Sequence, residues 1–383
     1  MISKRNKLLL IFIIIIIIVS YSFFYDLFSL KNRIIASILI DDINIYQYNY
    51  DYLKIFKKKS SKTNKINFQN SYNNKFLDYY RIRNCLYKNY LTVPIVFSSD
   101  DIYAPFLYIT MVSILENANK NTFYAFYILV SLNFSKKYQN LINKLKYDYK
   151  CIIHFIFIKN LFVKTVRKIS YITSTTYYRL LIGDILPEEF EKCIYLDIDI
   201  CVCKDLSELF NINIGDNYIA GVVAPGYYFS EKYHCKRLNL PTMKQYINAG
   251  VLLMNLKQIR KDNMTQKFIK LSKNIYDYQD QDILNIACYG KILTLPPKYN
   301  ALVGRLKENN PLLRNLYSED DISEANNSPH IIHFPSIRKP WNSIGVYMED
   351  YWWNIAKKTP FINSMFNRHE IYKKRIKKNP GLI

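Results

Sequence analysis

The segment Cys193–Val202 constrains the fold more than any other, because two carboxylates interrupt a short apolar, β-branched run. Such a run is typical of a buried central strand, where charges must be neutralised. On a strand, Asp197 and Asp199 would project to the same face, about 6.6 Å apart. Both could then bind one divalent cation beside a diphosphate. A lone Asp-x-Asp is also common at solvent-exposed strand ends, so the pattern alone leaves that alternative open.

Further segments accompany this pair in a fixed order: Ile95–Asp101, Tyr246–Leu256, Tyr278–Asn285 and His333–Trp341. In that order and at those separations, the chain resembles the family 8 glycosyltransferases over roughly residues 93 to 345. That family includes lipopolysaccharide galactosyl- and glucosyltransferases and is similar to glycogenin. The resemblance implies an α/β fold of the GT-A type, a UDP-sugar donor and a bound cation.

The resemblance also assigns roles to individual residues. It implies three metal ligands, namely Asp197, Asp199 and His333. It implies a nucleotide-sugar site formed by Ser98, Asp100, Arg179, Asp197, Asn248, Ala249, Gly250 and Lys339. Asp280 would contact sugar hydroxyls, and Gln281 would lie near the anomeric carbon. Without the resemblance, a lone histidine indicates a core residue, and acidic residues that begin a helix, such as Asp282, indicate a cap.

The expected reaction is transfer of galactose or glucose from a UDP-sugar to a hydroxyl of a glycan or glycolipid, with retention of configuration. Two carboxylates, one imidazole and diphosphate oxygens suit Mn²⁺ somewhat better than Mg²⁺ or Ca²⁺. A retaining glycosidase has a carboxylate nucleophile at the anomeric carbon, but Gln281 is a poor nucleophile. Direct front-face attack by the acceptor is therefore expected. A nucleotidyltransferase and a catalytically inactive, membrane-held glycan-binding scaffold remain as alternatives.

The chain departs from the family pattern at three places. Ile102 stands where bacterial relatives have an asparagine that contacts the nucleotide. Pro335 and Ser336 replace a Cys-Gly pair after the metal-binding histidine. Ala224-Pro225 lies near the position of an acceptor-binding aspartate in the galactosyltransferases, so their acceptor cannot be assumed here.

Strands and helices alternate along the central part of the chain. Hydrophobic patterning predicts strands at 94–98, 123–132, 151–158, 251–256 and 329–334. It predicts helices at 103–118, 135–147, 174–181 and 278–287, with Ser135 as an N-cap and Arg179 carried inward. This order predicts a mostly parallel central sheet, whose ligands lie at the carboxyl ends of its strands.

Four regions are expected: a membrane anchor (1–25), a partly helical stem or linker (26–92), the GT-A domain (93–360) and a basic tail (361–383). Leu8–Tyr25 is an uncharged run of 18 residues, and as a helix it would be about 27 Å long, enough for a bilayer core. No small-x-small cleavage site follows the apolar run, which favours an uncleaved anchor over a signal peptide.

The net charge of +22 arises from 53 Lys and Arg against 31 Asp and Glu. Such an excess is compatible with nucleic acid or with an anionic membrane. No nucleic-acid-binding motif is visible, so the membrane is the expected partner, through the N-terminal helix and also the basic tail. The catalytic domain should face the compartment that holds UDP-sugars, either the bacterial cytoplasm or a secretory lumen. Seven cysteines without metal or C-x-x-C spacing do not indicate a disulfide framework, although a single bond in an oxidising lumen is compatible with them.

Overall fold

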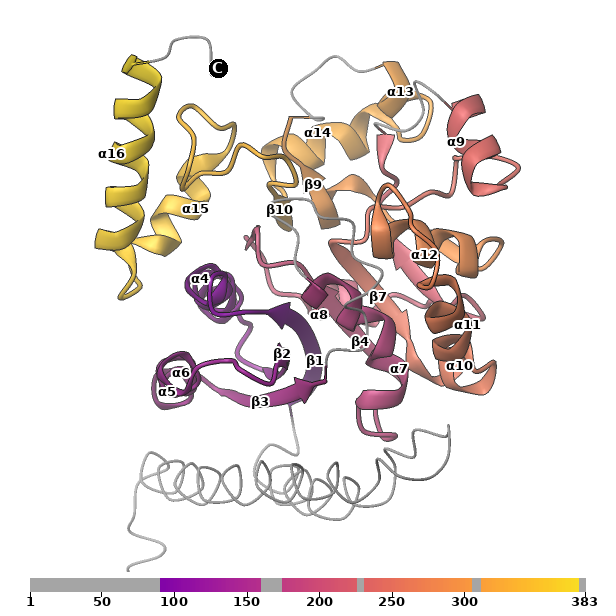
Figure 1. Ribbon diagram of the computed structural model, residues 1–383, viewed down its shortest axis with the longest axis horizontal. Coiled ribbons are helices and arrows are strands. Elements are labelled where there is room, and N and C mark those ends of the chain that lie inside the picture. The colour runs from indigo at the N-terminus through magenta and orange to yellow at the C-terminus, as the bar shows by residue number, and fades with distance from the viewer. Residues whose placement is uncertain (1–89, 160–173, 226–230, 305–310, 379–383) are drawn as a thin grey trace, which may run out of the picture. The chain divides into compact units, whose positions relative to one another are not determined.

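The computed structural model describes residues 90–159, 174–225, 231–304 and 311–378 (Figure 1). The chain divides into two units, and the elements discussed below, apart from residues 146–148, belong to the unit formed by residues 67–145 and 149–383. The predicted anchor (1–25) and nearly all of the predicted stem (26–92) lie outside the described residues. Among the described helices, none is both long enough and apolar enough to cross a bilayer.

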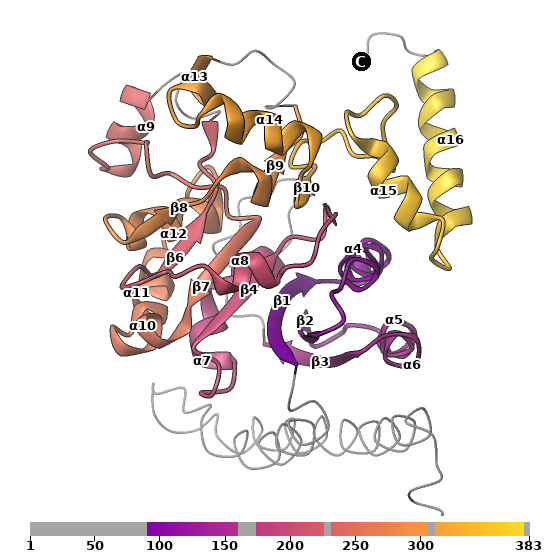
Figure 2. The ribbon, with the colours of Figure 1, turned by 180° about the vertical axis from the view of Figure 1, so that it is seen from behind.

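A large sheet has seven strands in the order β3-β2-β1-β4-β7-β6-β8 (Figures 1 and 2). These strands are β1 (Leu91–Ser99), β2 (Thr122–Ser131), β3 (Cys151–Ile158), β4 (Lys192–Leu196), β6 (Ile219–Gly221), β7 (Val251–Asn255) and β8 (Ile292–Thr294). Strands β3, β2, β1 and β4 are parallel, and β6 is parallel to β8. Strand β7 runs antiparallel to both of its neighbours. The sheet is therefore mostly parallel, as predicted.

A second, small sheet has three strands in the order β5-β10-β9. These are β5 (Ile200–Val202), β9 (Ala301–Leu302) and β10 (Ile331–His333). Strand β10 is antiparallel to β5 and parallel to β9. This sheet follows directly from the large one, because β5 comes immediately after β4 and the carboxylate pair.

The remaining elements are helices of varied length. The α-helices are α4 (Ala104–Glu116), α5 (Lys136–Asn143), α6 (Leu145–Asp148), α7 (Ile182–Ile185), α8 (Ser207–Asn211), α9 (Glu231–Leu238), α10 (Leu256–Lys261), α11 (Met264–Leu271), α12 (Gln279–Cys288), α13 (Pro311–Arg314), α14 (Glu319–Asn327), α15 (Glu349–Ala356) and α16 (Ile362–Lys378). The 3-10 helices are η1 (Ser174–Leu181) and η3 (Pro297–Asn300). Most of the predicted basic tail (361–383) is thus the helix α16.

Alternate residues of the central strands enter two separate cores. Ile95 and Ile194 belong to a core that includes the buried face of α4. Val96 and Tyr195 belong to another core, to which α7, α10, α11 and α12 contribute. Figures 1 and 2 show these helices on the side of the sheet opposite α4. Both faces are covered, which explains why these parallel strands are continuous apolar runs rather than alternating ones.

The predicted single strand Cys193–Val202 is instead two strands in different sheets. Strand β4 ends at Leu196, β5 begins at Ile200, and residues 197–199 connect them. The hydroxyl of Thr110 on α4 stabilises this turn by donating to the carbonyls of Ile198 (2.9 Å) and Ile200 (3.1 Å). The two carboxylates therefore converge because the chain turns there, and not because of strand alternation.

Arg260 on α10 crosslinks a loop that would otherwise have unpaired carbonyls. Its guanidinium donates to carbonyl oxygens at 2.8 to 3.2 Å, those of Gly183, Leu186, Pro187, Glu188 and Phe190. We expect Arg260→Met to lower the free energy of unfolding by about 3 kcal/mol, since it leaves several of these acceptors without a donor. Urea denaturation of the full chain measures this loss.

The neighbouring Lys257 provides the control for that experiment. It forms an exposed ion pair with Glu191, so Lys257→Met should change the free energy of unfolding by less than about 1 kcal/mol. Equal losses for the Arg260 and Lys257 variants would contradict a structural role for the carbonyl contacts.

Candidate active site

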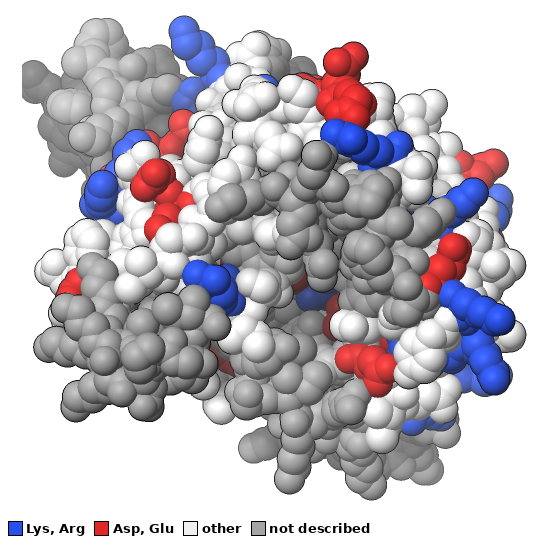
Figure 3. Space-filling view, turned by 90° about the horizontal axis from the view of Figure 1, so that it is seen from above, with Lys and Arg blue, Asp and Glu red and all other residues white. Residues whose placement is uncertain are grey.

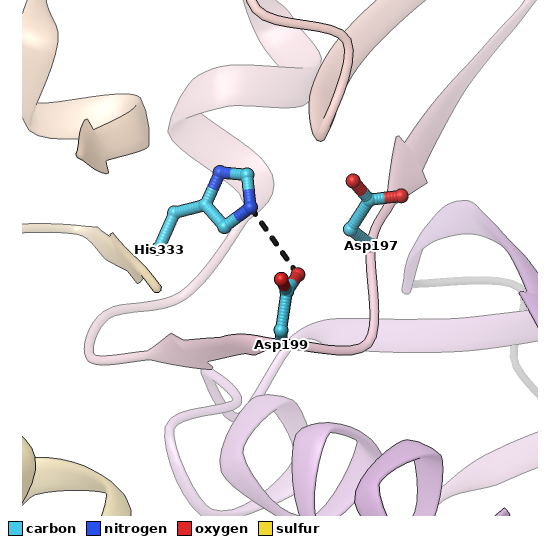
Figure 4. Close-up of side chains that lie close together, drawn as sticks. All are labelled: Asp197, Asp199 and His333. Atoms are coloured by element: carbon cyan, nitrogen blue, oxygen red, sulfur yellow. Dashed lines mark ion pairs between the residues drawn. The ribbon is translucent and has the colours of Figure 1, made fainter. Parts of the chain in front are cut away.

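Asp197, Asp199 and His333 come together at the junction of the two sheets. Each offers one ligand atom, and these atoms lie within 4.8 Å of one another. Figure 4 shows the three side chains pointing into the same space, with His333 Nε2 3.2 Å from an oxygen of Asp199. The predicted metal ligands are thus close in space, although His333 comes from β10 and the carboxylates from the β4–β5 turn.

The donor set fits a divalent cation. Asp199 Oδ1 is buried and faces His333 Nε2, while the other oxygen pairs with Lys339. Burial alone would raise the pKa of Asp199, but the Lys339 ammonium, the largest opposing cause, helps to hold it well below its usual value. Asp199 is therefore ionised at neutral pH. Two carboxylates and an imidazole are ligands that suit Mn²⁺, and also Mg²⁺ where phosphate oxygens complete the site.

Gly250 lies directly against two of these ligands. A Cβ atom at this position would lie 2.3 Å from His333 Cε1 and 2.9 Å from Asp197 Oδ2. Both distances are shorter than a carbon contact allows, so only glycine fits beside the ligands in this arrangement. Gly250 reaches this edge because β7 is antiparallel to β4, with Leu196 opposite Val251. Sequence patterning had predicted a strand here but not its direction.

Arg179 enters the site from η1, as predicted, and is buried. Its guanidinium contacts Asp197 at 2.8 Å and Asp280 at 2.9 Å, and donates to the carbonyl of Ala249. It also lies over the ring of Tyr195, 4.2 Å from the centroid. Burial lowers the pKa of Arg179, but the two carboxylates outweigh burial and raise it. Arg179 is therefore a fixed positive charge that orients both acids.

Asp280 is buried at the start of α12 and accepts hydrogen bonds from Arg179 and Thr176. Burial raises its pKa from 3.8 to about 6, aided by Asp197 and opposed by Arg179. Because the folded-state pKa lies above the unfolded one, its contribution to stability is present below about pH 4 and is lost as pH rises through about 6.

We therefore expect the free energy of unfolding of the wild type to fall relative to Asp280→Asn between about pH 4 and 6. The change should reach about 3 kcal/mol, at about 1.4 kcal/mol per pKa unit. Urea denaturation across this pH range measures it. Asp205→Asn serves as control. Burial raises the pKa of Asp205 but hydrogen bonds lower it by more, so the difference from the wild type should change little between about pH 4 and 6. A pH-independent difference for Asp280 would contradict the raised pKa.

Gln281 is held by several hydrogen bonds. Its Oε1 accepts from Asn248 Nδ2 at 3.2 Å and from the Ala249 amide at 3.1 Å. Its Nε2 donates to the Tyr246 hydroxyl at 3.1 Å. Asn248 Oδ1 in turn accepts from the Gly250 amide at 3.0 Å. The predicted residues 248–250 and Gln281 thus form one connected group.

Asp282 lies behind this group and is fully buried. It pairs with Arg237 of α9 at 2.9 Å and accepts from the Tyr246 hydroxyl at 2.6 Å. It also accepts from the Tyr278 amide at 3.0 Å, which agrees with its predicted role as a cap. Its oxygens are fully engaged with these donors, so Asp282 supports the site from behind.

Ser98 lies at the end of β1 and Asp100 directly after the strand, at the edge of the large sheet where the other site residues lie. Ser98 is buried and lies next to Tyr195, whose hydroxyl donates to Asp197 at 3.0 Å. Asp100 accepts from the amides of Ile102 and Tyr103 at 3.0 and 3.2 Å and so caps the turn before α4. These contacts account for Asp100 structurally, and its contact with a nucleotide stays a prediction.

Charges in the site nearly balance. Asp197, Asp199 and Asp280 oppose Arg179 and Lys339, so three carboxylates against two cations leave a net charge of −1. A dication would change this to +1, which favours an anionic ligand such as a diphosphate. Figure 3 shows both acidic and basic side chains deep in a hollow of the upper surface.

Several residues of this site were not predicted. They are Thr176, Tyr195, Arg237, Tyr246 and Asn300. Tyr195 had a detectable signal, because it lies two residues before Asp197 in the apolar run that was predicted to be one strand. Thr176 and Tyr246 lie in segments that the sequence had singled out, but nothing in the sequence marks these two residues. Arg237 and Asn300 have no local signal, and only the fold brings the four residues to the site.

The chain is similar to a family of known proteins and to individual members of that family. The profile of the family described as "Glycosyl transferase family 8" matches residues 94–345. A Haemophilus influenzae protein assigned as a glycosyltransferase is 35% identical over 55% of this chain and 63% of its own length. An Escherichia coli lipopolysaccharide 1,2-glucosyltransferase is 31% identical over 73% of this chain and 80% of its own length. The match thus spans less than two thirds of the Haemophilus protein.

Among solved structures, the galactosyltransferase LgtC in complex with donor and acceptor sugar analogues is similar. Its TM-score is 0.60 at 25% identity, and the match covers 70% of this chain and 96% of that one.

Proposed function

Because the chain belongs to glycosyltransferase family 8, we propose that it transfers glucose or galactose from a UDP-sugar to a hydroxyl of a glycan or glycolipid. The convergence of Asp197, Asp199 and His333 carries this proposal, because their donor atoms lie within 4.8 Å of one another beside Lys339 and Arg179. The similar glucosyltransferase and galactosyltransferase support the choice of sugars. The lipopolysaccharide named for the E. coli relative is the acceptor class we propose.

The three ligands would hold Mn²⁺ or Mg²⁺. When bound, the cation supplies Lewis-acid stabilisation of the charge on the departing UDP. Lys339 places an ammonium beside Asp199, where it can stabilise the same charge. Arg179 is fixed by Asp197 and Asp280, so its charge needs no reorganisation during the reaction.

The hydrogen bonds of the site support retention through direct attack. Gln281 Oε1 already accepts two hydrogen bonds, from Asn248 and Ala249, and an amide is a weak nucleophile. Asp282 is engaged by Arg237 and Tyr246. Asp280 is held by Arg179 and Thr176. The contacts of Asp280 and Asp282 thus disfavour both as the nucleophile of a double displacement. We propose that the acceptor attacks the same face from which UDP leaves, while Asp280 and Gln281 orient the sugar.

An assay of UDP release tests the proposal. The full chain is incubated with Mn²⁺ and separately with UDP-glucose, UDP-galactose and other UDP-sugars, with and without lipopolysaccharide acceptors. We expect one hexose donor to be used above the others and an α-linked product from an α-linked donor by proton NMR. Release of pyrophosphate instead of UDP would identify a nucleotidyltransferase. Absence of any turnover would favour the inactive scaffold.

Membrane attachment through residues 1–25 and the basic tail at 361–383 is also proposed. Its support is the uncharged run Leu8–Tyr25 and the excess of Lys and Arg at the C-terminus. The domain would face the compartment that holds UDP-sugars. Fractionation of cells that express the full chain tests this attachment.

A further inference from the structure

Asn300 connects the metal ligands to the donor-site turn without being a metal ligand itself. It ends η3 and is fully buried. Its Nδ2 lies 2.9 Å from Asn248 Oδ1, and its Oδ1 lies 2.9 Å from His333 Nδ1. Asn300 therefore bridges the turn before β7 and the histidine of β10.

Backbone amides fix the orientation of the first two side-chain amides in this chain of hydrogen bonds. The Ala249 amide can only donate, so the Gln281 atom at 3.1 Å is an oxygen. That oxygen also faces Asn248 at 3.2 Å, which must present its nitrogen there. The other atom of the Asn248 side chain is then an oxygen, in agreement with its contact to the Gly250 amide at 3.0 Å.

The alternation of donors and acceptors extends to the histidine. Asn300 must donate to the oxygen of Asn248, so its nitrogen lies on that side and its oxygen faces His333. An amide oxygen only accepts, and His333 Nδ1 must therefore carry the proton. Nε2 is left as the nitrogen that can offer a lone pair, and it is the one directed at Asp199.

We propose that Asn300 is a positioning residue that fixes the tautomer and the ring orientation of His333 for cation binding. The inference rests on the cation site of the proposed function. Partners of this kind raise metal affinity because the ligand needs neither a proton shift nor a rotation when the metal binds. Through Asn248, the same residue joins cation binding to the turn that contains Gly250.

Mn²⁺ affinity tests the proposal without relying on catalysis. Free Mn²⁺ is titrated by electron paramagnetic resonance against the full chain and the variants Asn300→Leu and Asn300→Asp. The leucine keeps the size but cannot accept, and we expect the Kd for Mn²⁺ to rise by about 10- to 100-fold. The aspartate still accepts from His333 Nδ1 and should restore most of the affinity.

Asn255 provides the matched control. It is also a buried asparagine with two side-chain hydrogen bonds, to the Gln258 amide and the Gly215 carbonyl, but it lies outside the site. Asn255→Leu should lower stability and leave the Kd for Mn²⁺ unchanged. Equal affinity of Asn300→Leu and the wild type, or no Mn²⁺ binding by the wild type, would overturn the inference.

A second measurement, by NMR, does not depend on the folding of the Asn300 variants. Nitrogen-15 NMR of the Mg²⁺-loaded wild type reports which ring nitrogen of His333 is protonated, with His333→Gln identifying the signal among 5 histidines. We expect the proton on Nδ1, and a proton on Nε2 alone would overturn the inference. If the variants follow the predicted order of Mn²⁺ affinity but no donor releases UDP, this inference holds and the proposed function fails.

Discussion

Asp199→Asn is expected to lower the rate of sugar transfer at least about 100-fold, the loss typical when one electrostatic stabiliser of a transition state is removed. The variant keeps the side-chain volume but removes a negative charge from the ligand set of Asp197, Asp199 and His333. It also removes the anionic partner of Lys339. Rate measured against Mn²⁺ concentration should show a much higher requirement for the ion.

Folding should survive this substitution with some loss of stability, because the lowered pKa of Asp199 means that the fold favours its ionised form. Circular dichroism and thermal unfolding of Asp199→Asn check this point. Asp205→Asn is a control, since Asp205 is a partly buried carboxylate that hydrogen-bonds Tyr124 and Thr122 away from the site. Full activity of the wild type in excess EDTA would contradict the cation hypothesis.

Gly250→Ala should have a comparable effect for a steric reason. The new methyl group would lie 2.3 Å from His333 Cε1, so the imidazole must move by about 1 Å. A displacement of that size in a catalytic group costs about 100-fold in rate. We expect weaker Mn²⁺ binding and a matching loss of transfer, measured by Mn²⁺ titration and UDP release.

Gly183→Ala is the control, because it also adds a methyl group at a crowded glycine but lies outside the site. Its Cβ would lie 2.6 Å from a methyl of Ile259, within the core between α7 and α10. Gly183→Ala should therefore lower stability while the folded protein keeps its Mn²⁺ affinity and rate. Normal Mn²⁺ binding by Gly250→Ala would show that the site tolerates the shift and would contradict the tight packing around His333.

The family, and the convergence of Asp197, Asp199 and His333, could be predicted because several motifs occur in order along the chain. Strands β1, β2, β3 and β7 of the large sheet were predicted because apolar runs such as β2 and β3 have a clear pattern, whereas the three-residue strands β6 and β8 were not predicted. The small sheet was missed as a sheet, since its strands have two or three residues and no period can be measured over so few.

Two parts of the site depend on tertiary packing alone. The break between β4 and β5 requires Thr110, a distant hydroxyl on α4 whose role has no local signal. Asn300 follows a Pro-rich turn and is one of many asparagines in this chain, and only its place between Asn248 and His333 distinguishes it. Such residues become visible when the donors and acceptors of the folded protein are matched.

The position of the ligands between two sheets has a thermodynamic consequence. Asp197 extends from β4 of the large sheet, whereas His333 belongs to β10 of the small one. A cation bound by residues of both sheets would crosslink them. If the ion binds more tightly when the two sheets are in contact, this difference in binding free energy stabilises the contact. Binding of the cation and packing of the small sheet against the large one are thus linked equilibria. Each should strengthen the other by the same factor.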